Sequence, residues 1–180
     1  MADLQRTDGG TGCVESPLGK ETRFGAYSVV LRSANDLNEP IRAGLGLTEE
    51  DQYLEVHVPD SVTGTPRTVL RAFKEGVVDL ADFLLKERLS PKCLLGVTHE
   101  NVARPAQRFL NFQVLSGVPE EAVGREKATR VDEGYEKTKR AGDGIPRGPL
   151  CLCYQSYEAF MAFTERLRGK RGGHPAAAGG

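Results

Sequence analysis

The chain has 180 residues, with 24 Lys and Arg against 25 Asp and Glu, so its formal net charge is -1. This length is enough for one domain with a real hydrophobic core. The balanced charge gives no overall basic field, so neither nucleic acid nor a membrane surface is an expected partner. The 4 cysteines have neither the density of a disulfide framework nor C-x-x-C spacing, which favours a reducing, cytoplasmic compartment.

Both ends of the chain are expected to be tails. Residues 1–20 are rich in Gly, Thr and Ser and contain no apolar run, so we expect neither a signal peptide nor a membrane anchor there. Residues 169–180 are rich in Gly and Ala. Because such segments bury too little apolar surface to order themselves, we predict two disordered tails. One α/β domain is expected at residues 21–168, with a charged insertion at 120–148 that is either a solvated helix or a mobile excursion.

The first third of the domain predicts a strand, a short helix and a second strand. Arg23 to Ser33 is rich in β-branched and aromatic residues, which favour a strand. Asn35-Asp36 can cap a short helix. Gln52 to Val58 alternates between apolar and polar residues, as a strand with one packed face does. The alternation puts Leu54, Val56 and Val58 on one face and Tyr53, Glu55 and His57 on the other.

The longest helix and a buried strand follow. Thr65 and Pro66 suit the start of this helix, because Thr caps a free amide and Pro lacks only an amide that has no helical partner there. We expect the helix to end near Arg88. Cys93 to Val97 is a continuous apolar run, typical of a strand covered on both faces. It is expected to be central and parallel to the strand that ends at Val58.

The last part of the domain completes the predicted fold. Asn101 to Leu110 has a helical pattern, in which Pro105 fits best in a first turn, and Phe112 to Val114 predicts a return to strand. Leu150 to Tyr154 predicts a last strand, and Ser156 caps a final helix. The fold class is therefore α/β, a single domain with a mixed, partly parallel sheet and packed helices.

Each strand-to-helix junction places a polar loop just past the carboxyl end of a strand, where open α/β sheets bind ligands. In the first loop, Thr63, Gly64 and Thr65 precede a helix N-terminus, whose free amides and partial positive charge attract anions. They are candidates for binding a cofactor phosphate, and the alternative is a simple turn and helix cap. Arg104, with Arg108 one turn later, either helps to hold a phosphate or solvates a helix face.

His57, His99 and Glu100 are the candidate catalytic residues. A histidine near its ordinary pKa of about 6.5 takes up and releases protons at neutral pH. If the two strands are neighbours, both imidazoles approach one cleft, with Glu100 beside them. The alternative is that both histidines are structural. No metal site is expected, because Ala103 stands where a zinc-hydrolase motif starting at His99 needs its second histidine.

Two tyrosines and three cysteines each have a structural interpretation beside a chemical one. Tyr154 and Tyr157 are either general acids or structural residues. Cys151 and Cys153 share one face of a strand, and Cys93 lies on a neighbouring strand of the same sheet. Buried thiols of this kind pack as small hydrophobes.

Four segments across the central half of the chain resemble the YkoP-like domain of bacteria. They are Tyr53–His57, Leu80–Leu84, Leu95–Thr98 and Arg108–Val114. This family occurs alone or joined to polysaccharide deacetylases. The resemblance therefore implies a bacterial domain, and one alternative function is that of a non-catalytic accessory protein in cell-envelope polysaccharide metabolism.

A second, more distant resemblance is to the GNAT acetyltransferase fold. Ala103 and Asn111-Phe112 occupy the spacing of the Ala and Gly-Phe that close the second half of that core. The resemblance implies an acyl-CoA cofactor, held where two parallel strands part, by a phosphate loop that is degenerate in this chain. The predicted function is small-molecule binding or acyl transfer. In the active version, main-chain amides around Gly64 hold the donor's phosphate, and His57 or Glu100 takes the proton from an acceptor amine.

Overall fold

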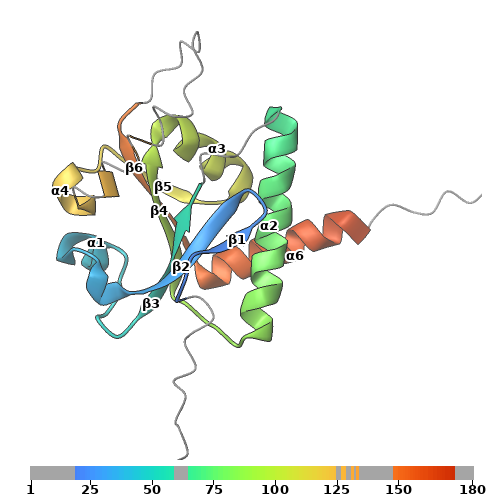
Figure 1. Cartoon of the computed structure of the whole chain (residues 1–180), viewed down its shortest axis with the longest axis horizontal. Coiled ribbons are helices and arrows are strands. Elements are labelled where there is room, and N and C mark those ends of the chain that lie inside the picture. The colour runs from blue at the N-terminus through green and yellow to red at the C-terminus, as the bar shows by residue number, and fades with distance from the viewer. Residues whose placement is uncertain are drawn as a thin grey trace, which may run out of the picture.

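The computed structural model describes residues 19–58, 65–124, 127–128, 131, 133 and 148–172. Most of the two predicted tails and of the charged insertion therefore lies outside the described residues. The elements follow one another in an α/β order that matches the predicted one closely, and Figure 1 shows their arrangement. In chain order they are β1 (Thr22–Phe24), β2 (Tyr27–Ser33), the 3-10 helix η1 (Ala34–Asp36), α1 (Glu39–Gly44), β3 (Gln52–His57), α2 (Pro66–Lys86), β4 (Cys93–His99), α3 (Glu100–Leu110), β5 (Gln113–Ser116), α4 (Glu120–Val123), β6 (Leu150–Ser156) and α6 (Tyr157–Gly172).

The described strands form one mixed sheet in the order β1-β2-β3-β4-β6-β5. Among them β3 and β4 are parallel neighbours, whereas β1–β2, β2–β3, β4–β6 and β5–β6 are antiparallel pairs. The predicted α/β class and the predicted parallel pair are therefore confirmed. The parallel pair arises because α2 carries the chain from the end of β3 back to the start of β4.

Helices cover both faces of the sheet (Figure 1). The face that we call the α2 face packs against α2 and α6, and its core includes Leu54, Leu80, Leu84 and Phe160. The opposite face, which we call the α1 face, packs against α1 and α4. Its core residues come from the sheet, from these helices and from the segments next to them: Leu37, Ile41, Tyr53, Cys93, Leu95, Val118, Val123, Ala128 and Leu152.

The predicted first strand is in fact a hairpin. It divides into β1 and β2 at Gly25, whose φ of +58° suits glycine far better than any other residue. The turn also presses against α2, because a Cβ on Gly25 would lie 2.5 Å from the carbonyl oxygen of Ala72. A Cβ on Gly76 would in turn lie 2.3 Å from the carbonyl oxygen of Phe24. Single-strand propensity could not reveal this turn, because it depends on two glycines that are far apart in the sequence.

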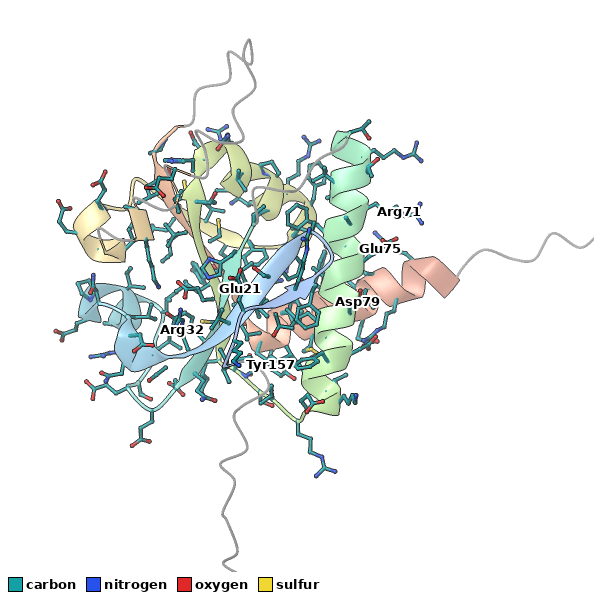
Figure 2. All side chains as sticks on the ribbon, in the orientation of Figure 1. Glu21, Arg32, Arg71, Glu75, Asp79 and Tyr157 are labelled. Atoms are coloured by element: carbon teal, nitrogen blue, oxygen red, sulfur yellow. The ribbon has the colours of Figure 1, made fainter. Side chains whose placement is uncertain are left out.

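The helix ends follow the predicted capping. Thr65 caps α2, since its Oγ accepts a hydrogen bond from the Thr68 amide, and Ser156 caps α6 through the amide of Ala159. Along α2, Arg71, Glu75 and Asp79 lie on the side away from the sheet (Figure 2). Apolar packing on the sheet side and charge on the other is the usual pattern of a surface helix.

Three local features differ from the prediction or refine it. Pro105 lies inside α3 rather than in its first turn, because the helix already begins at Glu100. The helix α6 continues to Gly172, so it includes the first residues of the predicted C-terminal tail. The buried thiols of Cys151 and Cys153 share the α2 face with Ala103, whereas Cys93 is buried on the α1 face.

Candidate functional site

The carboxyl ends of β3 and β4 lie side by side and point the same way, as the two junctions predict. Their paired residues end at Glu55↔Leu95. Beyond this point β3 stays paired with β2 as far as His57, and β4 stays paired with β6 as far as His99. Within the described residues, each strand thus continues past the end of the parallel ladder with its other neighbour. The two strands are still close one residue further on, where a Cβ on Gly96 would lie 3.2 Å from the carbonyl oxygen of Val56.

Glu55 is a buried carboxylate that lies on the α1 face among three basic side chains. Its Oε2 accepts a hydrogen bond from Arg32 Nε at 3.0 Å, and its Oε1 lies 2.6 Å from Lys127 Nζ. The Nε2 atom of His57 lies 3.7 Å from Oε2. We call Arg32, Glu55, His57 and Lys127 the Glu55 cluster. Glu55 is its most buried member, with 9% of its side chain exposed against 32–44% for the others.

Strand alternation and pairing bring the Glu55 cluster together. Tyr53, Glu55 and His57 are alternate residues of β3 and share one face, and the β2–β3 register sets Arg32 opposite Tyr53. The ammonium group of Lys127 also lies 5.9 Å from the centroid of the Tyr53 ring, a cation–π distance. Lys127 therefore contacts both a carboxylate and an aromatic ring of the same strand.

The pKa of Glu55 lies below its ordinary value. Burial raises this pKa, but the hydrogen bond and charge of Lys127, with contributions from His57 and Arg32, outweigh the burial. Glu55 is consequently ionised at neutral pH. It is suited to orienting His57 and fixing positive charge, and poorly suited to being the group that takes up a proton itself.

His99 and Glu100 lie at the junction of β4 and α3. His99 is 4% exposed, and the next residue begins α3. Glu100 forms an ion pair with Arg104, with 2.7 Å between Oε1 and Nη2. It also packs against the segment that leads into β6, because a Cβ on Gly148 would lie 2.8 Å from the Glu100 Cβ. Of the three candidate catalytic residues, His57 belongs to the Glu55 cluster, and Glu100 pairs with Arg104 at the start of α3.

The candidate phosphate-binding residues are described only in part. Thr63 and Gly64 lie outside the described residues. Thr65 is the helix cap, and its Oγ lies 3.3 Å from the Thr68 amide and 2.9 Å from the Thr68 hydroxyl. Arg104 donates a hydrogen bond to Glu100. The cap interpretation of Thr65 is confirmed, and the binding of a phosphate at this loop stays a prediction.

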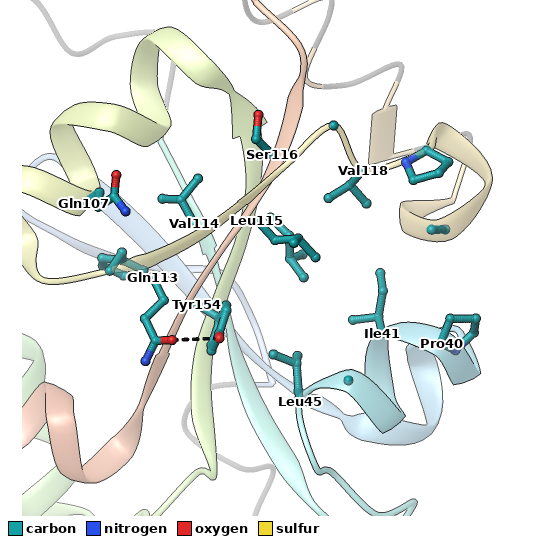
Figure 3. A pocket seen from close by; sticks show the side chains of 16 residues that line it. Pro40, Ile41, Leu45, Gln107, Gln113, Val114, Leu115, Ser116, Val118 and Tyr154 are labelled. Carbon is teal, nitrogen blue, oxygen red and sulfur yellow. Dashed lines mark hydrogen bonds between the residues drawn. The ribbon is translucent and has the colours of Figure 1, made fainter.

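A groove of about 680 Å³ lies along the edge strand β5 of the sheet. Its size falls in the range of small-molecule sites. Tyr154 and Gln113 form a hydrogen-bonded pair in it, in which the tyrosine hydroxyl donates to Oε1 at 2.7 Å (Figure 3). Its sixteen lining residues are Pro40, Ile41, Gly44, Leu45, Gln107, Phe112, Gln113, Val114, Leu115, Ser116, Gly117, Val118, Pro119, Ala122, Leu152 and Tyr154.

Two residues of the groove, Tyr154 and Gln113, lie on the same sheet face as the Glu55 cluster. Strand registers align Glu55 with Leu95, Leu95 with Tyr154, and Tyr154 with Gln113. Because neighbouring strands are about 4.8 Å apart, Glu55 and Tyr154 are separated by roughly 10 Å across the sheet. Tyr154 is therefore the tyrosine that shares a face with Glu55, whereas Tyr157 packs against the core of the α2 face.

Arg32 and Lys127 are the members of the site that sequence reasoning missed. Arg32 could have been found from the alternation in β2 once its pairing with β3 was assumed. Lys127 could not, because it lies in the charged segment and carries no pattern that distinguishes it from its neighbours. Among the residues that the structure describes, no group of three or more His, Cys, Asp or Glu side chains could hold a metal ion.

The described part of the chain contains no helix with both the length and the apolar character needed to cross a bilayer.

Comparison with family models, with curated proteins and with solved structures found no match to this chain. The functional assignment therefore depends on the residues and geometry above.

Proposed function

We propose that this chain is a small-molecule-binding α/β domain of YkoP-like type that transfers an acyl group at the carboxyl ends of β3 and β4. The observation that carries the proposal is the end of the parallel ladder at Glu55↔Leu95, while both strands continue. The N-terminus of α2 follows β3 in the chain and supplies amides and partial positive charge for an anionic donor.

The acyl donor is a substrate of the proposed reaction, and the first turn of α2 limits where its phosphate fits. Thr65 already satisfies the amide of Thr68, and Pro66 has no amide. We propose that a donor phosphate is held by the main-chain amides around Gly64 and by those left free in the first turn of α2. The proposal therefore makes binding of the donor phosphate depend on main-chain amides rather than on the Arg104 side chain.

In the chemical step that we propose, His57 takes the proton and Glu55 orients it. The acceptor amine attacks the thioester carbonyl, the new C–N bond forms, and the C–S bond breaks. His57 accepts the proton that the amine nitrogen loses, and the departing thiolate takes a proton from water. Glu55 stays ionised and stabilises the imidazolium that forms, as a buried carboxylate beside a histidine does.

Ligand binding tests the first half of this proposal. Coenzyme A and acetyl-CoA at millimolar concentration are expected to raise the melting temperature, because a ligand that binds only the folded state stabilises it. If neither compound binds, acyl transfer should be abandoned. Amino sugars and nucleotide sugars in the same screen test the alternative role in envelope polysaccharide metabolism.

Variants at the Glu55 cluster test the second half. His57→Asn is expected to lower the rate of acyl transfer about 100-fold or more while leaving donor binding unchanged, since general base catalysis contributes roughly that factor. Glu75→Gln, on the outer side of α2, is the matched control and should retain full activity (Figure 2). Equal rates for His57→Asn and the wild type would exclude His57 as the base.

A further inference from the structure

The groove beside β5 surrounds the open edge of the sheet. Its lining includes the unbroken run Phe112–Pro119, whereas a pocket on one face would be lined by alternate residues of a strand. The remaining walls come from both sides of the sheet, with Gln107 from α3 on one side and α1 on the other, and β5 runs between them (Figure 3). The main chain along the edge of β5 is therefore part of the groove.

The two edges of the sheet differ in how they are protected. Edge strands usually carry charged residues, Pro or bulges that prevent pairing with another chain. The edge strand β1 carries Arg23, shortly after Lys20 and Glu21. The edge strand β5 has the sequence Gln-Val-Leu-Ser, without any charge, and its Leu115 is 58% exposed. Among the described strands, β5 is paired on one side only, with β6.

The charge of the groove indicates which partner it suits. All sixteen lining residues are uncharged, in a chain where 27% of residues are charged. In a twofold-symmetric interface the same patch meets itself, so any net charge on the patch would repel its own copy. A neutral apolar patch escapes this repulsion, and it offers no ion pair to a charged partner.

We propose that β5 pairs with β5 of a second copy of this chain, antiparallel and about a twofold axis, so that one sheet runs through the dimer. Leu115 is aligned with Leu152 and so lies on the α1 face. In the dimer each Leu115 enters the partner's groove, on the side that Ile41 and Leu45 line. Main-chain hydrogen bonds along β5 supply pairing, and Leu115 supplies the buried apolar contact. This inference does not depend on the proposed acyl transfer.

The test is the oligomeric state of the full chain and of two matched variants. Leu115→Lys places a charge on the β5 edge, and Leu85→Lys places one at a leucine of α2 that is 53% exposed. Sedimentation equilibrium over a dilution series from millimolar to submicromolar protein measures the dissociation constant of each. We expect a wild-type dimer, a weakening of at least about tenfold in Leu115→Lys, and no change in Leu85→Lys.

Hydrogen exchange distinguishes loss of pairing from loss of folding. Both variants should keep the wild-type protection of the β3 and β4 amides, whereas Leu115→Lys should lose protection in β5 alone. A wild-type protein that is monomeric over the whole series overturns the proposal and leaves the groove to another kind of ligand. A dimer that Leu115→Lys and Leu85→Lys weaken equally, or not at all, also overturns it, because its interface then lies elsewhere.

Discussion

The two faces of the sheet are built from the same strands but serve different purposes. On the α2 face, Leu54, Leu80 and Leu84 are fully buried, and α2 approaches the β1–β2 turn so closely that only glycine fits at the contact. On the α1 face, three partly exposed basic side chains surround the buried Glu55, and a groove stays open beside β5.

Strand alternation places the residues that stabilise the fold and the residues of the candidate site on opposite faces of the sheet. Leu54 and Glu55 are consecutive residues of β3, and one completes an apolar core while the other collects three basic side chains. A fully packed face resists any change in volume, so it cannot adapt to a ligand. We expect substitutions on the α2 face to lower stability most, and those on the α1 face to change acid sensitivity, ligand binding or association.

The largest effect is expected at the glycine contact of the α2 face. Gly76→Ala should lower the free energy of unfolding by about 3 kcal/mol, because its Cβ would meet the main chain of Phe24, which cannot rotate away. Urea unfolding measures the change. Gly44→Ala is the control, since nothing lies within 4 Å of a Cβ there, and it should be neutral or stabilise by up to about 1 kcal/mol. Equal losses in both variants would contradict the close contact.

A smaller, pH-dependent effect is expected at the Glu55 cluster. Because the folded-state pKa of Glu55 is lowered, the stability it contributes is complete above its unfolded pKa of about 4.3 and is lost as pH falls through the folded value. Lys127→Met removes a main cause of this lowering. It should lower stability at pH 7 by about 1 kcal/mol, a modest value because the pair is partly exposed, and should flatten the acid dependence below pH 5.

Lys92→Met is the control for that experiment. Lys92 lies 3.9 Å from Asp51, but the hydrogen bonds from the backbone and side chain of Thr48 lower the pKa of Asp51 more than Lys92 does. The acid dependence of Lys92→Met should therefore match that of the wild type. Unfolding free energies from pH 3 to pH 7 measure both variants, and identical curves for Lys127→Met and the wild type would show that Lys127 does not hold Glu55 in its ionised form.

The smallest effect is expected in the groove. Tyr154→Phe removes the hydrogen bond to Gln113 and should cost about 0.5–1 kcal/mol, since the pair is partly exposed to water. A double-mutant cycle with Gln113→Ala isolates the pair from the packing of each side chain. A coupling energy indistinguishable from zero would mean that the hydrogen bond between Tyr154 and Gln113 does not stabilise the fold.

Much of the fold follows from local sequence patterns. The alternation in Gln52–Val58, the cap at Thr65-Pro66 and the apolar run from Cys93 predicted β3, α2 and β4, and the order of these elements predicted a parallel pair. Each of these signals lies within a few residues of the element that it predicts. Hydrophobic periodicity and capping act over that same range, so the sequence carries them directly.

The site was predicted less completely, because its parts come from distant segments. His57 lies beside Glu55 as strand alternation allows, His99 is buried and Glu100 pairs with Arg104, and a joint catalytic role for His57, His99 and Glu100 stays a prediction. Lys127 reaches Glu55 from the charged segment. No local pattern relates these residues.

The amino-acid sequence by itself determined most of the helices and strands, and which face of β3 is polar. Only the tertiary structure decided that the first strand is a hairpin, that Lys127 covers Glu55, and that α1 and α4 border a groove at β5. The amide of Asn38 donates to the carbonyl oxygens of Glu121 and Ala122, more than eighty residues later in the chain. Such contacts depend on how whole elements pack, and packing is a property of the folded chain that no short window of sequence contains.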